Sequence, residues 1–245
     1  MKAFCVTCFH LTKFSQKKSA QKKKFKLAHI LSLVYIYIYM RFLDLFAGTH
    51  SVGNVARDMG FEVVSLDLAD ADICSDIMVW DYTVYEPGYF DVIWSSPPCD
   101  TFSHARFKNI GRHGITRESI EADILSKGLP ILRRTQEIIN YFNPTLYFIE
   151  NPATGAMKRF INLPFYTVDY CMYGFNCRKR TNIWTNLKGF TPKICNKHCG
   201  SFINGKHLYN SVGGTKTQKG QGSGSCKKDR YKIPIELLKD LFKNI

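Results

Sequence analysis

The chain has 245 residues, of which 45% are hydrophobic and 14% aromatic, and its formal net charge is +14. A chain of this length and composition buries a sizeable core, which favours one domain with at most a small appendage. Its nine cysteines lack the dense, regular spacing of a small secreted disulfide scaffold, which excludes that class and favours a reducing, intracellular location.

The charge is spread unevenly along the chain. The net charge is +8 over residues 1–39, −3 over residues 40–186 and +9 over residues 187–245. A near-neutral body with a basic C-terminal appendage suits a polyanionic partner, because Lys and Arg displace counterions from a phosphate backbone. An ordinary solvated surface explains the charge equally well.

Residues 1–39 combine a basic stretch with an apolar one. The uncharged run from Leu27 to Met40 has 14 residues, too few to span a bilayer comfortably, and no small-residue cleavage site follows it. We therefore expect no membrane segment here. We interpret residues 1–39 as a disordered extension, or a mis-annotated one upstream of a start codon at Met40. A weak role of its lysines at a membrane surface or on nucleic acid is the alternative.

From Met40 onward, strand and helix patterns alternate. We predict helices over 51–59, 117–127 and 129–142. Strands are predicted over 40–46, 61–68, 90–96, 145–152, 165–174 and 179–187, with a weak further element at 71–77. A polar loop is predicted over 104–114. This alternation is typical of βαβ units and predicts an α/β fold with a mostly parallel sheet. Residues 187–230 are rich in Gly and Lys, and residues 231–245 end in a short amphipathic helix.

The segment "DLFAGTHSVG" (44–53) reads as a strand, a small-residue loop and a helix start. Gly48 lets the backbone approach a ligand, and Asp67, at the end of the next strand, can accept hydrogen bonds from ribose hydroxyls. The sequence has neither GxxxxGK[ST] nor a full GxGxxG, so no phosphate cradle is expected. These features favour S-adenosylmethionine, a nucleoside with an amino-acid tail. Asp76 and Ile77 are expected to close over its adenine, although a loop cap is an equally good interpretation of Asp76.

Three further motifs end or begin strands on the same expected edge of the sheet. Cys99 in "SSPPCDTFS" is a candidate nucleophile, and Glu150 in "FIENP" is a candidate proton donor. Arg178 and Arg180 lie two residues apart, so they point to one face and can hold a carbonyl oxygen or a phosphate. Separately, each motif is explained as well by a buried Cys, a capping Glu or a solvated turn. Their joint occurrence favours a site.

In this order, the four motifs resemble those of the cytosine-5 DNA methyltransferases, across roughly residues 40–186. The resemblance implies a Rossmann-like class I methyltransferase fold, a catalytic domain over 40–186 and S-adenosylmethionine as cofactor. It implies that Cys99 is the nucleophile, that Glu150 contacts the base as an acid, and that the Arg178–Arg180 pair, through Arg180, holds the cytosine carbonyl. The cofactor would be lined by Asp44, Phe46, Ala47, Gly48, Thr49, Asp67, Asp76, Ile77 and Pro98.

The implied reaction is methyl transfer to carbon 5 of a cytosine flipped out of DNA. The polar loop would close over the flipped base and contact DNA through Ser103, Arg106, Lys108 and Arg112. The implied partners are DNA and, for a restriction-modification enzyme, a cognate restriction enzyme. The protein would act as a monomer in the cytoplasm, or wherever its target DNA resides.

Some features depart from the family pattern. Asp100 stands where the family usually has Gln, and residues 187–230 leave only a small region for target recognition. A catalytically inactive DNA-binding homologue therefore stays an alternative, as does a methyltransferase acting on tRNA cytosine or on an exocyclic amino group.

The C-terminal region also contains potential zinc ligands. Cys195, Cys199, His207 and Cys226 are of the right types, but their spacing matches no standard zinc knuckle. We expect free thiols and no bound metal here, with a zinc site through these four residues as the alternative.

Overall fold

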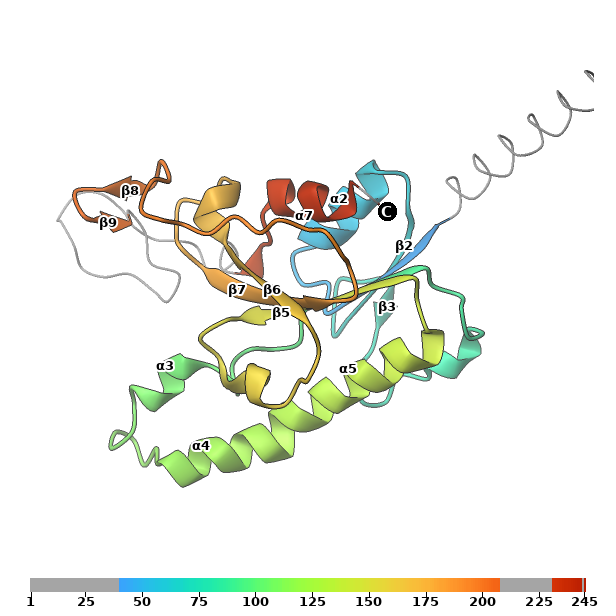
Figure 1. The fold of residues 1–245 in the computed structure, drawn as a ribbon. Helices are drawn as coiled ribbons and strands as arrows, with labels where there is room; N and C mark the ends of the chain where they lie inside the picture. The colour runs from blue at the N-terminus through green and yellow to red at the C-terminus, as the bar shows by residue number, and fades with distance from the viewer. Residues whose placement is uncertain (1–39, 208–230, 244) are drawn as a thin grey trace, which may run out of the picture. The chain divides into compact units, whose positions relative to one another are not determined.

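A seven-stranded sheet runs through the computed structural model of the chain, which describes residues 40–207, 231–243 and 245 (Figure 1). Its order is β3-β2-β1-β4-β5-β7-β6. Neighbouring strands are parallel from β3 to β5, whereas β7 is antiparallel to both β5 and β6. The strands are β1 (Arg41–Leu45), β2 (Glu62–Asp67), β3 (Ile73–Cys74), β4 (Val92–Ser95), β5 (Leu146–Pro152), β6 (Phe165–Asp169) and β7 (Arg180–Thr185). The predicted α/β fold with a mostly parallel, Rossmann-like sheet is confirmed.

The central strands are buried along nearly their whole length. In register, Leu43 of β1 lies between Val64 of β2 and Ile93 of β4, and both Leu43 and Ile93 are fully buried. Such near-continuous apolar strands form when helices cover both faces of a sheet. The apolar runs of the sequence therefore mark the middle of the sheet.

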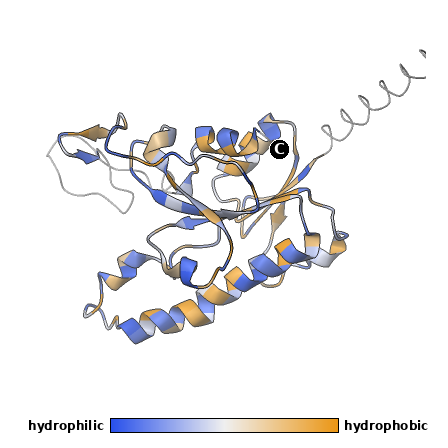
Figure 2. Ribbon diagram, in the orientation of Figure 1, coloured by the Kyte–Doolittle hydropathy of each residue, from blue (hydrophilic) through white to orange (hydrophobic). Residues whose placement is uncertain are grey.

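Helices cover the two faces (Figure 1). On one face lie α2 (Ser51–Asp58) and α7 (Ile235–Phe242), and on the other α4 (Arg117–Asp123) and α5 (Leu129–Phe142). Apolar and polar residues alternate along the α4–α5 rod (Figure 2), as expected for helices with one face on a core. Short helical segments complete the described chain: η1 (Tyr82–Val84), α3 (His104–Phe107), η3 (Ala156–Arg159) and η4 (Tyr170–Tyr173).

The α7 helix supplies an aromatic side chain to the centre of its face. The Phe242 ring lies 5.5 Å from that of Phe42, 6.1 Å from that of Trp94 and 5.7 Å from that of Phe148, between ring centroids. All four side chains are almost fully buried. The helix predicted near the end of the chain is thus part of the core.

The predicted break between helices 117–127 and 129–142 is wrong. α4 continues through a π-helical turn, η2 (Ile124–Gly128), directly into α5, whose first turn holds Pro130. Gly128 does not end a helix there. A Cβ at this position would lie 2.4 Å from Thr101 Oγ1 and 2.9 Å from the Phe102 ring, so the glycine is needed where the chain after β4 packs against the rod.

Two other segments differ from their sequence patterns. The strand predicted over 165–174 ends at Asp169, and η4 follows it up to Gly174, which has a φ of 88°. The polar loop 104–114 begins with the short helix α3. The Gly- and Lys-rich region contains a hairpin of β8 (Phe202–Ile203) and β9 (Lys206–His207), joined through Asn204 and Gly205, both with positive φ, as in a type I′ turn.

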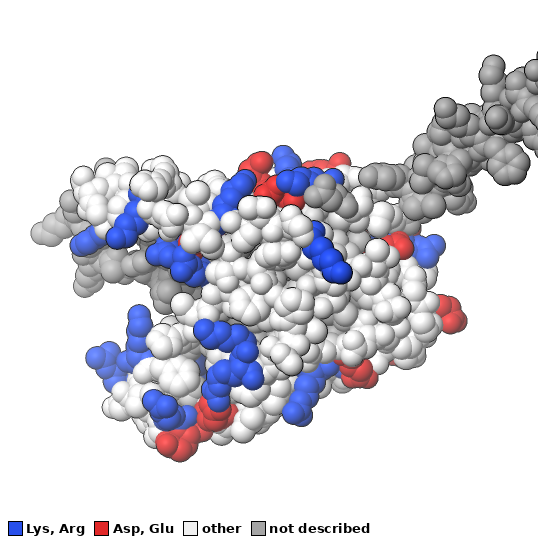
Figure 3. All heavy atoms as spheres, viewed as in Figure 1, with Lys and Arg blue, Asp and Glu red and all other residues white. Residues whose placement is uncertain are grey.

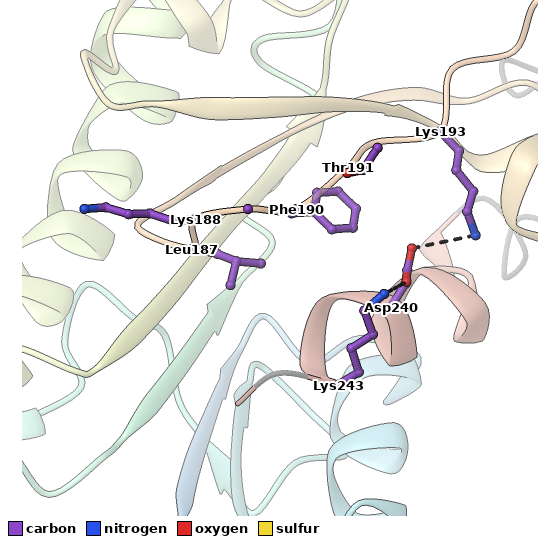
Figure 4. A pocket seen from close by; sticks show the side chains of 8 residues that line it. Leu187, Lys188, Phe190, Thr191, Lys193, Asp240 and Lys243 are labelled. Atoms are coloured by element: carbon purple, nitrogen blue, oxygen red, sulfur yellow. Dashed lines mark hydrogen bonds and ion pairs between the residues drawn. The ribbon is translucent and has the colours of Figure 1, made fainter.

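The segment that follows β7 runs back along α7 (Figure 4). Lys193 forms an ion pair with Asp240 of α7 at 3.7 Å, and its backbone N–H donates to the Tyr173 hydroxyl at 3.0 Å. A hollow of about 270 Å³ lies beside this ion pair. Within the described residues, no helix has the length and apolar character needed to cross a membrane.

We predict that Gly128→Ala destabilises the protein. The added methyl group forces Thr101 and the buried Phe102 away from the rod, and such overpacking costs about 1–3 kcal/mol. Urea unfolding measures the change in the free energy of unfolding. Gly200→Ala is the matched control, because a Cβ there meets no atom within 4 Å. Equal unfolding midpoints for the two variants would contradict the prediction.

Candidate active site

One cleft of about 900 Å³ opens at the carboxyl ends of β1, β2, β4 and β5. This is the edge at which open α/β sheets hold their ligands. All the predicted catalytic and cofactor-binding residues line it: Cys99, Glu150, Arg178 and Arg180, together with Asp44, Phe46, Ala47, Gly48, Thr49, Asp67, Asp76, Ile77 and Pro98. The sheet therefore brings together four motifs that lie far apart in the sequence.

The loop after β1 is bent by left-handed backbone at three positions. Phe46, Gly48 and His50 have φ values of 63°, 50° and 55°, which are unusual for Phe and His. The Gly48 N–H donates to Asp67 Oδ2 at 2.8 Å, so this loop is tied to the end of β2. Asp67 Oδ1 accepts from the Leu68 N–H at 2.7 Å. The result is a tight backbone turn with a carboxylate beside it.

A second carboxyl group lies deeper, below the same loop. Asp44 is 1% exposed, and its Oδ2 accepts from the Gly53 N–H of α2 at 3.0 Å. Burial raises the pKa of Asp44 to about 7, although the hydrogen bond from Gly53 and the charge of Arg57 partly oppose this shift. A buried acid without an ion-pair partner holds its proton near neutral pH.

This half of the cleft fits S-adenosylmethionine better than a phosphate ligand. One N–H group of the α2 N-terminus, that of Gly53, already donates to Asp44, and the acidic side chains of Asp44 and Asp67 line this part of the cleft. Those groups suit a ligand with hydroxyl groups and positive charge, and S-adenosylmethionine has both. Asp76 Oδ1 accepts from the Met78 N–H at 2.9 Å, so this side chain also has the capping role that the sequence left open.

Cys99 follows two prolines directly after β4, and its loop is held from below. Asn151 of β5 donates from Nδ2 to the Pro97 carbonyl oxygen at 3.0 Å, and Pro97 is buried. Burial raises the pKa of the Cys99 thiol, and the negative charges of Glu150 and, more weakly, Asp100 add to this shift. Lys179 opposes it. The charge of Lys179, which lies between Arg178 and Arg180 in the sequence, therefore favours the thiolate.

Glu150 lies at the buried end of β5 with two partners. Its Oε1 accepts from the Tyr170 hydroxyl at 2.9 Å and forms an ion pair with Lys179 Nζ at 3.4 Å. Lys179 Nζ also lies 4.9 Å from the centroid of the Tyr170 ring, a cation–π contact. Both polar contacts engage Oε1, so the carboxylate is oriented by one of its two oxygens.

The two arginines converge on a single buried carboxylate. Asp169, at the end of β6, is fully buried and accepts from Arg180 Nε at 2.9 Å, Arg180 Nη2 at 2.7 Å and Arg178 Nε at 3.3 Å. Burial by itself would raise the pKa of Asp169, but the hydrogen bonds from Arg180, the Cys195 N–H and Arg178 outweigh it and lower that pKa. These hydrogen bonds fix the Arg180 side chain at the start of β7, where it lines the cleft.

Of the four residues predicted to contact DNA, two line the cleft and two do not. Ser103 and Lys108 line the cleft, and Ser103 caps α3 by accepting from the Ala105 N–H. Arg106 is paired with Asp123 of α4, and neither Arg106 nor Arg112 lines the cleft. Lys and Arg side chains gather at the end of the molecule that carries α3 and the β8–β9 hairpin, on both sides of a notch in the surface (Figure 3).

Sequence reasoning missed several residues of the site. Lys179 lies between Arg178 and Arg180, and its contact with Glu150 depends on the antiparallel pairing of β5 and β7. Tyr231 and Ile233 also line the cleft, and the Ile233 N–H donates to Ser51 Oγ at 3.2 Å across 182 residues of sequence. No sequence signal near Tyr231 indicates this return of the chain.

Three of the four potential zinc ligands named from the sequence lie together in the structure. The structure brings Cys195, Cys199 and His207 together, and their fourth neighbour is Cys171, which sequence reasoning did not select. Cys226 lies outside the described residues. The four grouped residues do not line the cleft.

We predict that Asp44→Asn stabilises the protein more at pH 8 than at pH 5. The pKa of Asp44 is about 7 in the folded state against 3.8 ordinarily, so the folded state holds this proton more tightly and loses stability as the pH rises from about 4 to about 7. Asparagine cannot ionise. The advantage of the variant should therefore grow by ~2 kcal/mol between pH 5 and pH 8. Urea unfolding of both proteins without ligand tests this, and parallel pH profiles would contradict it.

We predict opposite shifts of the Cys99 pKa for two neighbouring substitutions. Lys179→Met removes the charge that favours the thiolate and should raise the pKa of Cys99, whereas Asp100→Asn removes an opposing charge and should lower it. The rate of alkylation of Cys99 by iodoacetamide, followed by peptide mass spectrometry from pH 6 to pH 10, reports the thiolate fraction. Shifts in the same direction would show that these charges do not control the thiol.

Comparison with known proteins agrees with the motifs in the cleft. No family model matches the chain. A protein of Frog virus 3 (isolate Goorha), described as "Probable DNA (cytosine-5)-methyltransferase", is 42% identical over 214 residues, which cover 82% of this chain and 98% of the relative.

Two solved structures are also similar to the chain. An Entamoeba histolytica methyltransferase, EhMeth, matches with a TM-score of 0.47 and 13% identity, over 64% of this chain and 56% of that one. The S. pombe Dnmt2 methyltransferase matches with a TM-score of 0.40 and 12% identity, over 67% and 57%. The chain thus spans less than two thirds of either structure. At 42% identity over almost the whole viral relative, the chain belongs to the DNA (cytosine-5)-methyltransferase family.

Proposed function

We propose that the enzyme transfers a methyl group from S-adenosylmethionine to carbon 5 of cytosine in DNA, through a covalent adduct with Cys99. The observation that carries this proposal is the meeting of Cys99, Glu150, Lys179 and Arg180 in the same cleft as residues 46–49 and Asp67. The first group suits an electron-poor base, and the second suits a nucleoside cofactor. One cleft therefore contains the residues needed for both reactants.

Cys99 is the proposed nucleophile. Carbon 5 of cytosine is too weakly nucleophilic to take a methyl group directly, so the Cys99 thiolate first adds to carbon 6. The thiol must lose its proton for this step, and burial together with Glu150 opposes that loss while Lys179 favours it. The activity should therefore depend on the charge of Lys179 as well as on the thiol.

Glu150 is the proposed proton donor to ring nitrogen 3. Adding the thiolate to carbon 6 places negative charge on the ring. A proton passed to nitrogen 3 from the carboxylic acid form of Glu150 neutralises this charge, and the product is an enamine. Tyr170 and Lys179 orient the carboxyl group through Oε1, so Oε2 is the oxygen assigned to the base. The buried setting of Glu150, which is 6% exposed, keeps bulk water from competing for that position.

Arg180 is proposed to hold the carbonyl oxygen of the base. Its Nε and Nη2 bind Asp169, so Nη1 is the donor assigned to the base. Arg178, which shares Asp169, is the second candidate and lies at the same mouth of the cleft. A guanidinium fixed by a buried carboxylate loses little freedom when it binds, which favours a defined position for the base.

S-adenosylmethionine, when bound, supplies the methyl group from its sulfonium to carbon 5 of the enamine. Carbon 5 then gives its proton to a water molecule, the bond between carbon 6 and the Cys99 sulfur breaks with the thiolate as leaving group, and nitrogen 3 returns its proton to Glu150, which restores the aromatic ring. Residues 46–49, Asp67 and Asp76 are proposed to bind the cofactor. Ile77, which is 3% exposed, is proposed to pack against its adenine.

The target cytosine must leave the DNA stack to reach Cys99, because carbon 6 is inaccessible within a duplex. Ser103, His104 and Lys108 line the cleft on the side of α3 and are proposed to contact the displaced strand. Arg106 and Arg112 are proposed to act outside the cleft, on neighbouring phosphates. The basic surface around the notch suits this arrangement (Figure 3).

We expect a covalent adduct with DNA that contains 5-fluorocytosine in place of cytosine. The fluorine cannot leave carbon 5 as a proton does, so the Cys99–cytosine bond persists after methyl transfer. The expected result is a shifted band in denaturing gels that requires S-adenosylmethionine and is absent in Cys99→Ala. Glu150→Gln should slow its formation by 10²–10⁴-fold, the usual contribution of general acid catalysis.

Cys74→Ser is the control for removing a thiol, because Cys74 is exposed in β3 and does not line the cleft. It should form the adduct at the wild-type rate. Methyl transfer that survives in Cys99→Ala would overturn the nucleophile assignment, and binding without transfer in the wild type would identify an inactive homologue. A matched RNA with 5-fluorocytidine tests the substrate class, and a faster adduct on RNA would overturn DNA as the substrate.

A further inference from the structure

A cluster of four metal-ligand side chains lies outside the cleft. It consists of Cys171, Cys195, Cys199 and His207, whose ligand atoms all lie within 4.8 Å of one another. The residues come from three segments: Cys171 from η4, Cys195 and Cys199 from the loop that follows β7, and His207 from β9. The three cysteines are buried. No step proposed for methyl transfer uses any of these four residues.

The distances in this cluster are those of a tetrahedral zinc site. Cys195 Sγ lies 3.6 Å from Cys199 Sγ and 3.3 Å from His207 Nε2, and Cys171 Sγ lies 3.7 Å from the same nitrogen. Zinc bonds of about 2.3 Å to sulfur and about 2.0 Å to nitrogen place tetrahedral sulfurs about 3.8 Å apart and a sulfur and nitrogen about 3.5 Å apart. These three separations lie close to those values, and the other pairs lie within 4.8 Å, so small side-chain shifts bring all four ligands onto one ion.

Hydrophobic packing alone does not explain the cluster. Buried thiols can pack as small apolar groups, but here a histidine nitrogen faces two of the sulfurs, and the partly buried apolar neighbours are Met172 and Phe202. β8 and β9 have two residues each. A hairpin this short needs further packing or a cross-link to be stable.

We infer that Cys171, Cys195, Cys199 and His207 bind one zinc ion, which fixes the loop after β7 and the β8–β9 hairpin to η4. Each thiol loses its proton on binding, and His207 coordinates through Nε2. Three thiolates and one imidazole are typical ligands of structural zinc, and four protein ligands leave no open position for water or substrate. The ion therefore has a structural role.

The charges around the cluster suit such a site. Two positive charges on Zn²⁺ and three negative charges on the thiolates leave one net negative charge. Arg180 lies close enough to Cys195 and Cys171 to interact with both electrostatically. The site would therefore be balanced by the same guanidinium that Asp169 holds.

The zinc site would also position the active site, a consequence that rests on the proposed function although metal binding does not. Asp169, Tyr170 and Cys171 are consecutive. Asp169 binds Arg180 and accepts from the Cys195 N–H at 2.9 Å, and Tyr170 donates to Glu150. An ion bound by Cys171 and Cys195 restrains residues 169 and 170 from two sides, because Cys171 follows Tyr170 in the chain and the Cys195 N–H donates to Asp169. It would thereby restrain the two residues that orient Arg180 and Glu150.

The metal content of the full chain tests the site. The protein is purified under reducing conditions without chelators, and its metals are measured by inductively coupled plasma mass spectrometry. We expect one zinc per chain, lost at least tenfold in Cys171→Ser and Cys195→Ser. Cys226→Ser and Cys74→Ser are matched controls that should keep the ion. Zinc lost in Cys226→Ser but kept in Cys171→Ser would overturn this ligand set.

Measurements on the wild type keep the test independent of whether the variants fold. Replacement of zinc by Co²⁺ should give a strong thiolate-to-metal charge-transfer band and the visible absorption of tetrahedral cobalt. A mercurial reagent that modifies thiols should release the zinc. Wild-type protein that purifies without metal and has all nine thiols reactive in denaturant would overturn the inference. So would wild-type protein in which only seven thiols react, because the other two would then form a disulfide.

The link to the active site has a separate readout. Stripping zinc from the wild type should slow adduct formation with 5-fluorocytosine DNA at least tenfold while S-adenosylmethionine still binds, as measured by calorimetry. An unchanged adduct rate would overturn the positioning role. If the zinc-loaded enzyme forms no adduct at all, the proposed function fails while the metal site stands.

Discussion

Asp169 is a fully buried carboxylate, and its charge is stable there only because two guanidinium groups and a backbone N–H face it. Removing one partner of a buried ion pair leaves an uncompensated charge that costs about 3–5 kcal/mol. The arrangement of β6, β7 and the loop at Cys195 is therefore coupled, since β6 carries the carboxylate and each of the other two contributes a donor to it. The position of Arg180 at the cleft follows from that coupling.

Which residues meet at the carboxyl edge of the sheet was largely predictable from the sequence. Cys99, Glu150 and Asp67 each follow an apolar run, and parallel strands place such residues on one edge whatever lies between them. The motif residues therefore meet because of a rule that acts locally on each strand. The same rule accounts for the mostly parallel sheet, since β1, β4 and β5 are buried along nearly their whole length.

Contacts that depend on distant segments could not be predicted in this way. Lys179 reaches Glu150 only because β7 pairs antiparallel to β5, a register that no local pattern specifies. Cys171 follows an apolar strand and gives no sign that the chain turns there into η4. The continuous rod from α4 to α5 was missed because Gly and Pro usually interrupt a helix, whereas here Gly128 allows close packing and Pro130 follows a π-helical turn.

The position of α7 has a consequence for how the chain folds during synthesis. The faces of Phe42 and Trp94 that α7 covers become buried only when Phe242 docks, and the bond from Ile233 to Ser51 spans 182 residues. A ribosome releases β1, β4 and β5 before α7, so a sheet formed from these strands exposes this aromatic surface until α7 emerges. Such late, long-range closure slows folding and leaves an intermediate whose exposed aromatic surface favours aggregation.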